Sequence, residues 1–201
     1  MSRTAREVNL STRAARERLK PSGKPYYRSL DQGFLFAMIG DASDAAEMLT
    51  SGITARRSTG YTLEMPWWLS QLAVAHVDLD QLDDAQRCID EALDAIEKTK
   101  ERWCEAEAYR LAGVIALLSP ERETAKAQTY FERALSAARQ QQAKSWELRA
   151  AMSLARLWRS QGKVSASARS VGSGLSVVYG GVRYARSEGG EGAAPYIGSV
   201  I

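Results

Sequence analysis

The stretch PWWLSQLAVAHVDLDQLDDAQRCIDEALDAIEK (66–98) decides the fold, because it contains no interior glycine or proline and is long enough for two helices. Its apolar residues recur at the three- and four-residue spacing of a helix, first over 69–76 and then over 85–96. The carboxylates of Asp83-Asp84 stand where the second helix would begin, and the helix macrodipole favours negative charge there. The pattern therefore predicts two packed helices, with small alanines allowing close approach and Ile89 filling the gap between them.

The same pattern recurs in a second pair of helices and in two partial units. The second pair carries it at Tyr109, Gly113, Ala116, Ala127, Phe131 and Ala134. A later first helix is expected over 146–158, closing at Gly162, and an earlier second helix over 45–55, ending before Gly60. This spacing resembles that of tetratricopeptide repeats (TPRs), whose helical pairs stack into a solenoid. The resemblance implies an all-α, TPR-like helical-hairpin solenoid, and we expect disordered N- and C-terminal ends on either side of it.

Composition divides the 201-residue chain into three parts. The net charge is only +3, but residues 1–30 hold eight Lys and Arg against two Glu, whereas eight of the 15 glycines lie in the last 38 residues. We therefore expect a basic, mostly disordered arm over 1–36, a repeat domain over 37–163 and a disordered Gly/Ser-rich tail over 164–201.

Three strings of the repeat domain resemble the C-terminal TPR region of bacterial adenylate/guanylate cyclase-type proteins, in which a cyclase domain and an ATPase module precede the repeats. The strings are AAEMLTSGITARRSTGYTLEMPWWLSQLAVAH (45–76), ERWCEAEAYRLAGVIALLSP (101–120) and FERALSAARQQQAKSWELRAAMSLARLWRSQGK (131–163). The resemblance covers about 44–163 and implies a sensor or interaction module. It does not imply cyclase activity, because the sequence has no cyclase motif and no G-x-x-x-x-G-K-[ST] phosphate loop.

The basic arm carries a second resemblance. LSTRAARERLKPSGKPYYRSLDQG (10–33) is similar to the opening segment of phage-type tyrosine recombinases (integrases), which precedes their core DNA-binding domain. No recombinase Arg/His/Tyr set follows, so strand cleavage is not implied. The alternative function is DNA association through the cationic residues Arg13, Arg16, Arg18, Lys20 and Lys24. The other interpretation of the same residues is a solvated, partly disordered arm.

The tail is interpreted as a frameshifted coding sequence. Codons compatible with 177–184 and 188–194, read one base later, encode the strings WFTEGFD and KEAKAL that continue the cyclase-type family. We therefore hypothesise one frameshift near Lys163, which makes the chain a truncated remnant of a cyclase-type regulatory protein. Such a remnant need not retain a selected function. The last unit then lacks its second helix, and self-association through this uncapped end is expected.

Candidate binding residues follow from the repeat register, because positions 2, 5, 9 and 12 of first helices line the concave groove of such repeats. In the two complete units these positions are Trp67, Ser70, Val74, Val77, Glu107, Arg110, Val114 and Leu117. We expect them to contact a protein or peptide partner of unknown identity. For Trp67 and Trp68, packing against the preceding helix is an equally open alternative.

Residues that carry chemistry are sparse. The single His76 and the two cysteines, Cys88 and Cys104, cannot form a Cys/His structural zinc site, and no nucleophile–base pair is visible. We therefore expect no enzyme activity, cofactor or metal. No apolar run reaches the roughly 18 residues of a membrane span and no secretory signal is visible, so we expect a cytoplasmic protein with reduced thiols.

Overall fold

The structure is a computed structural model that describes residues 25–163. Seven α-helices and no β-strand occupy this range, which confirms the all-α prediction. The helices are α2 (Pro25–Met38), α3 (Ala42–Arg57), α4 (Met65–Asp78), α5 (Leu82–Thr99), α6 (Glu105–Leu118), α7 (Thr124–Gln140) and α8 (Lys144–Ser160). None of the described helices is long and apolar enough to cross a membrane.

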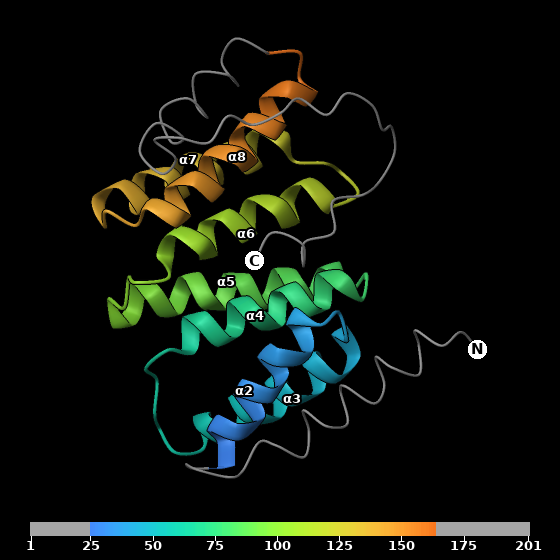
Figure 1. The fold of residues 1–201 in the computed structure, drawn as a ribbon, viewed down its shortest axis with the longest axis vertical. Helices are drawn as coiled ribbons and strands as arrows, with labels where there is room; N and C mark the ends of the chain where they lie inside the picture. Colours follow the sequence, from blue (N-terminus) through green and yellow to red (C-terminus); the bar gives the residue numbers. More distant parts are fainter. Residues whose placement is uncertain (1–24, 164–201) are drawn as a thin grey trace, which may run out of the picture.

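The helices stack as hairpins along the long axis of the molecule (Figure 1). Helices α2 and α3, α4 and α5, and α6 and α7 pack as three pairs, and α8 packs against α7 and α6. The first helices of successive units also contact one another, α2 with α4, α4 with α6 and α6 with α8. They therefore form one continuous side of the solenoid, which we call the first-helix face.

The helix boundaries follow from local sequence. Pro66 stands in the first turn of α4, where its missing N–H costs nothing. The αL conformations of Gly60 and Gly162 follow the ends of α3 and α8, and Pro120 lies in the break between α6 and α7. Helix α3 is the second helix that we expected for the earlier unit. Helix α8 is the first helix that we expected for the last unit.

The interior of each pair has the predicted small-to-large packing. Ala85, Ile89 and Ala92 of α5 are fully buried. In the next pair, a Cβ atom at Gly113 of α6 would lie 2.5 Å from the ring of Phe131 on α7, so only glycine fits against this buried aromatic side chain.

The predicted arm boundary is wrong for residues 25–36, which belong to helix α2 rather than to a disordered arm. Leu30 is fully buried against Gly52 of α3, and Leu49 of α3 packs against Gly33 of α2. These reciprocal contacts bury enough apolar surface to order a segment whose composition is only weakly helical. The first unit is therefore a complete hairpin. The rest of the arm and the whole tail, 164–201, lie outside the described residues.

A buried cation fixes the turn between the first two hairpins. Arg56 is 0% exposed, and its Nη2 donates to the carbonyl of Leu63 and, at 3.0 Å, to Glu64 Oε2. Its guanidinium lies 4.5 Å from the ring centre of Tyr61 and 5.1 Å from that of Tyr27. Because these partners come from α2 and from the loop before α4, Arg56 sets where the second unit begins.

The turn from α7 to α8 is held by an acidic side chain. Glu147 accepts hydrogen bonds from Arg139 Nε and Lys144 Nζ, both at 3.0 Å. The hydrogen bond from Arg139 and then that from Lys144 lower the pKa of Glu147, against the opposing effect of burial. The carboxylate also stands in the first turn of α8, where the macrodipole favours it.

Candidate functional site

A small hollow lies on the first-helix face. Its volume is about 40 Å³, and all its lining residues come from first helices. They are Phe34 of α2, Trp67, Gln71 and Val74 of α4, Glu107 and Arg110 of α6, and Arg149 of α8. Four successive units of the solenoid therefore form the hollow, and no single hairpin could form it alone.

Four aromatic rings form a row beside this hollow, which we call the aromatic row. The ring centres of Phe34 and Trp67 lie 6.1 Å apart, those of Trp67 and Trp103 5.5 Å, and those of Trp103 and Trp146 6.3 Å. All three pairs are tilted, an arrangement that aromatic quadrupoles favour. Trp103 is 43% exposed, so the row presents aromatic surface to the solvent.

Trp103 lies in the loop between α5 and α6 and is held in the row by Glu101. The indole Nε1 of Trp103 donates to Glu101 Oε1 at 2.6 Å. The backbone N of Glu64, just before α4, donates to both carboxylate oxygens of Glu101 at 2.8 and 2.9 Å. One carboxylate therefore joins the loop to the beginning of α4 and brings Trp103 beside Trp67.

The base of the hollow is charged, and we call Glu107, Arg110 and Arg149 the charged floor. Arg110 donates to Glu107 through Nε at 2.9 Å and through Nη2 at 2.7 Å, and both side chains are buried. Nη2 of Arg149 lies 2.9 Å from Glu107 Oε1, the oxygen that Arg110 Nη2 also contacts. Two guanidinium groups thus share one carboxylate, and the charged floor carries a net charge of +1.

Arg149 is the less satisfied of the two cations. Its Nε atom is buried and has no hydrogen-bond partner. Burial lowers the pKa of Arg149, the Glu107 carboxylate raises it and the nearby charge of Arg110 lowers it. The side chain is 24% exposed, so it remains accessible from the hollow.

The structure brings together four of the eight residues predicted to bind a partner. Trp67, Val74, Glu107 and Arg110 all line the hollow. The ring of Trp67 packs against Phe34 of the preceding hairpin and also lines the hollow, so this packing leaves contact with a partner open. Trp68, by contrast, is buried in the core.

The other four predicted residues lie elsewhere. Ser70 is 1% exposed and donates its hydroxyl hydrogen bond to the carbonyl of Pro66 at 2.7 Å, so it does not reach the surface. Val77, Val114 and Leu117 are half-buried and pack against the hydrophobic core clusters. The five basic residues of the alternative DNA site, Arg13 to Lys24, lie outside the described residues.

The register rule also identifies a residue that was not predicted. Trp67 and Glu107 occupy position 2 of their first helices, and the same position of the last unit is Arg149. The rule would have found Arg149 had it been applied to this incomplete unit. No register rule identifies Trp103, because it lies in a loop between helices. The position of this loop depends on the hydrogen bonds between Glu64 and Glu101, which are far apart in sequence.

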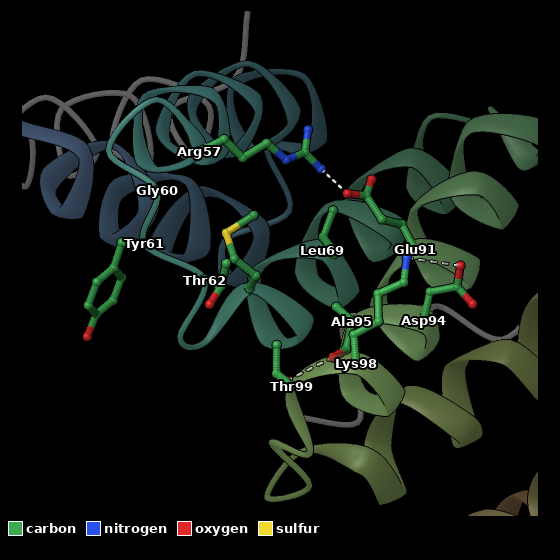
Figure 2. A pocket seen from close by; sticks show the side chains of 11 residues that line it. Arg57, Gly60, Tyr61, Thr62, Leu69, Glu91, Asp94, Ala95, Lys98 and Thr99 are labelled. Carbon is green, nitrogen blue, oxygen red and sulfur yellow. Dashed lines mark hydrogen bonds and ion pairs between the residues drawn. The ribbon is translucent and has the colours of Figure 1, made fainter.

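A larger pocket, of about 330 Å³, lies between the loop before α4 and helix α5 (Figure 2). Its floor includes Leu69, and the ion pair of Arg57 with Glu91 closes one side. On the other side Lys98 Nζ lies 4.0 Å from Asp94 Oδ2. Since the charged groups of this pocket are paired with one another, it shows no preference for a charged ligand. Among residues 25–163 no three side chains gather that would hold a metal ion.

No protein-family model matches the chain, and no curated protein matches it. Solved structures do resemble it. BtubC (BKLC) from P. vanneervenii superposes with a TM-score of 0.64 at 16% identity, covering 94% of this chain and 80% of BtubC. MamA superposes with a TM-score of 0.58 at 20% identity, covering 87% of this chain and 90% of MamA.

A third similar structure contains the nearly identical TPR-like repeats of a protein described as a kinesin light chain from Podosopora anserina. Its TM-score is 0.64 at 13% identity, with 81% of this chain and 80% of that chain covered. At these identities the likeness establishes the fold, which is that of a TPR-like helical repeat solenoid.

Proposed function

We propose that the chain is a non-catalytic, TPR-like protein-interaction module whose first-helix face binds an extended segment of a protein partner. The observation that carries this proposal is the aromatic row beside the charged floor. Aromatic residues and arginine are the side chains most enriched among those that dominate binding energy at protein interfaces.

The arrangement of the row supports an extended ligand rather than a compact one. Phe34, Trp67, Trp103 and Trp146 follow one another across three hairpins and α8, so a ligand that contacts all of them must run along the solenoid. Peptides in an extended or polyproline II conformation suit such a row, because they bind aromatic-lined grooves at a low entropic cost.

A random peptide library tests the proposal. Immobilised protein should select peptides whose binding decreases strongly in the variant Trp103→Ala, which removes exposed aromatic surface at the row. The matched control is Ile39→Ala, which removes a 56% exposed apolar side chain directly after α2, outside the row and the hollow. Peptides that lose binding equally in both variants, or a library with no binder, would contradict the proposal.

The compartment and the absence of catalysis belong to the same proposal. Cys88 and Cys104 are both free cysteines, which fits a reducing compartment such as the cytoplasm. The fold supports the non-catalytic role only in that TPR-like solenoids serve widely as binding scaffolds.

The origin of the chain is a proposal that rests on the sequence resemblances alone. We propose that the repeats derive from a cyclase-type regulatory protein and that a frameshift near Lys163 replaced the family ending. The nucleotide sequence of the locus tests this, because the frame one base later should encode the family strings. Self-association through the last unit is tested by light scattering, where a monomer at all concentrations would refute it.

DNA association through the basic arm stays the alternative function, and no contact within 25–163 favours it. A gel shift whose affinity falls steeply with salt, and which is lost on deleting residues 1–24, would support it. A protein that shifts no DNA at low salt would exclude it.

A further inference from the structure

We infer that the first-helix face selects its partner by an acidic side chain, whose carboxylate enters the hollow and binds Arg149 beside Trp67. The ligand is thus an internal peptide segment with an Asp or Glu next to residues that stack on the aromatic row. This inference rests on the proposed function and names the chemistry of its partner.

The charged floor has one cation more than it has anions. Arg110 and Arg149 share the single carboxylate of Glu107, and within the described part of the chain no other ion pair reaches either guanidinium. A buried charge without a partner is costly, and each of these cations is removed from much of the solvent. A second carboxylate from a ligand would make the number of anions equal to the number of cations.

Arg149 also has a hydrogen-bond donor without a partner. Nε of Arg149 is buried and unbonded, while Nη2 of the same side chain faces Glu107. A guanidinium offers donors in a planar fork that matches the two oxygens of a carboxylate. The fork of Arg149 is therefore only partly used, and the side chain is 24% exposed, so a second acceptor can approach it.

The hollow has the size of a carboxylate group. A hollow of about 40 Å³ holds roughly three water-sized groups, since one such group needs about 10–15 Å³. A carboxylate has three heavy atoms, whereas a phosphate group has five and a nucleobase more. Phe34, Trp67 and Val74 line the same hollow and reduce its exposure to water, which strengthens an ionic contact at its base.

Glu107 competes with the ligand for the same cation. If it is replaced by Gln, the internal carboxylate is lost and Arg149 is freed for the external one. The variant Glu107→Gln should therefore bind acidic peptides more tightly than the wild type while its folded state becomes less stable. A purely structural ion pair would lower both stability and binding, so this opposite response is specific to the inference.

The test uses nine-residue peptides, acetylated and amidated at their ends, with a fixed central Glu, Gln or Lys and random flanks. Binding to the full chain is measured by fluorescence polarisation. We expect the Glu pool to bind at least about tenfold more tightly than the Gln pool, as for a charge-assisted hydrogen bond. Arg149→Met should remove this preference.

The matched control is Arg156→Met, which removes an exposed arginine from the same helix and should leave the preference intact. Circular dichroism verifies that each variant is folded. If Arg149→Met fails to fold, Arg149→Lys serves instead, because it keeps the charge but loses the fork and should reduce the preference.

The outcomes separate this inference from the proposed function. If no pool binds, the proposed function fails and the inference fails with it. If pools bind without preferring Glu, or keep the preference in Arg149→Met, the inference alone is overturned. Preference for a free C-terminal carboxylate over an internal Glu, or for a peptide of residues 182–201 over every library member, would also overturn the assigned ligand.

Discussion

Replacing Gly113 by Ala should destabilise the protein, although alanine is the better helix former. In an exposed helix interior the change from Gly to Ala stabilises by about 1 kcal/mol. At position 113 the new Cβ would meet three ring atoms of Phe131 at 2.5, 2.7 and 3.0 Å, whereas ordinary contacts begin at 3.4 Å. Phe131 is 1% exposed and cannot turn into the solvent.

Helices α6 and α7 must therefore move apart or Phe131 must leave its preferred rotamer. Overpacking of this kind costs about 1–3 kcal/mol, and with three close contacts we expect a value near the upper end. After subtracting the gain in helix propensity, Gly113→Ala should lower the free energy of unfolding by about 2 kcal/mol.

Urea unfolding followed by circular dichroism measures this change. The background Phe131→Leu relieves the contact, so Gly113→Ala should cost at least about 1 kcal/mol less there, which is the coupling that a double-mutant cycle reports. Ser136→Ala, at an exposed position of α7, gives the control for helix propensity alone. A stabilised Gly113→Ala variant, or an equal cost in both backgrounds, would refute the reasoning.

Burial raises the pKa of Cys88 to about 11 and that of Cys104 to about 12, so both thiols should react slowly with a disulfide reagent at pH 8 and fully after unfolding; fast reaction of the native protein would contradict this. The pKa of Glu147 is lower in the folded protein than the value of 4.5 expected for the unfolded chain. Its ionised carboxylate therefore stabilises the fold above pH 4.5, and this contribution is lost as the pH falls through the folded pKa. Glu147→Gln should therefore be less stable at pH 7 and lose less stability on acidification in urea titrations from pH 7 to 3, whereas parallel curves would exclude the effect. Glu101→Ala should shift and broaden the indole N–H resonance of Trp103 in NMR spectra, and an unchanged resonance would show that the hydrogen bond does not position the ring.

The sequence was sufficient to predict the fold where apolar residues recur at the spacing of the repeat. Ala85, Ile89 and Ala92 recur at helical spacing, and the structure buries all three. Helix α2 was missed because its first residues follow the basic run of the arm directly, although Arg28 and Asp31 make the helix itself neutral and Tyr26 and Leu30 are spaced by one helical turn. Its order comes from contacts with α3, and composition contains no information on such contacts.

The site was predictable only in its helical part. Trp67 and Glu107 follow from the register, because side chains at one repeat position face the same side of a solenoid. Ser70 fulfils the same rule but is buried, and its hydroxyl donates to the carbonyl one turn earlier. The place of Trp103 depends on Glu101 reaching the backbone of Glu64, a contact 37 residues away in sequence.

Residues of α2, α4, α6 and α8 line the hollow, so its width depends on how these helices are placed relative to one another. In a solenoid, small rotations between neighbouring repeats add up to the superhelical pitch. A change in pitch that moves α8 relative to α4 shifts Arg149 relative to Trp67, and so opens or closes the hollow. A ligand bound there resists this shift and therefore limits the change in pitch of the solenoid. Stretching the solenoid from its ends should, by the same reasoning, release the ligand.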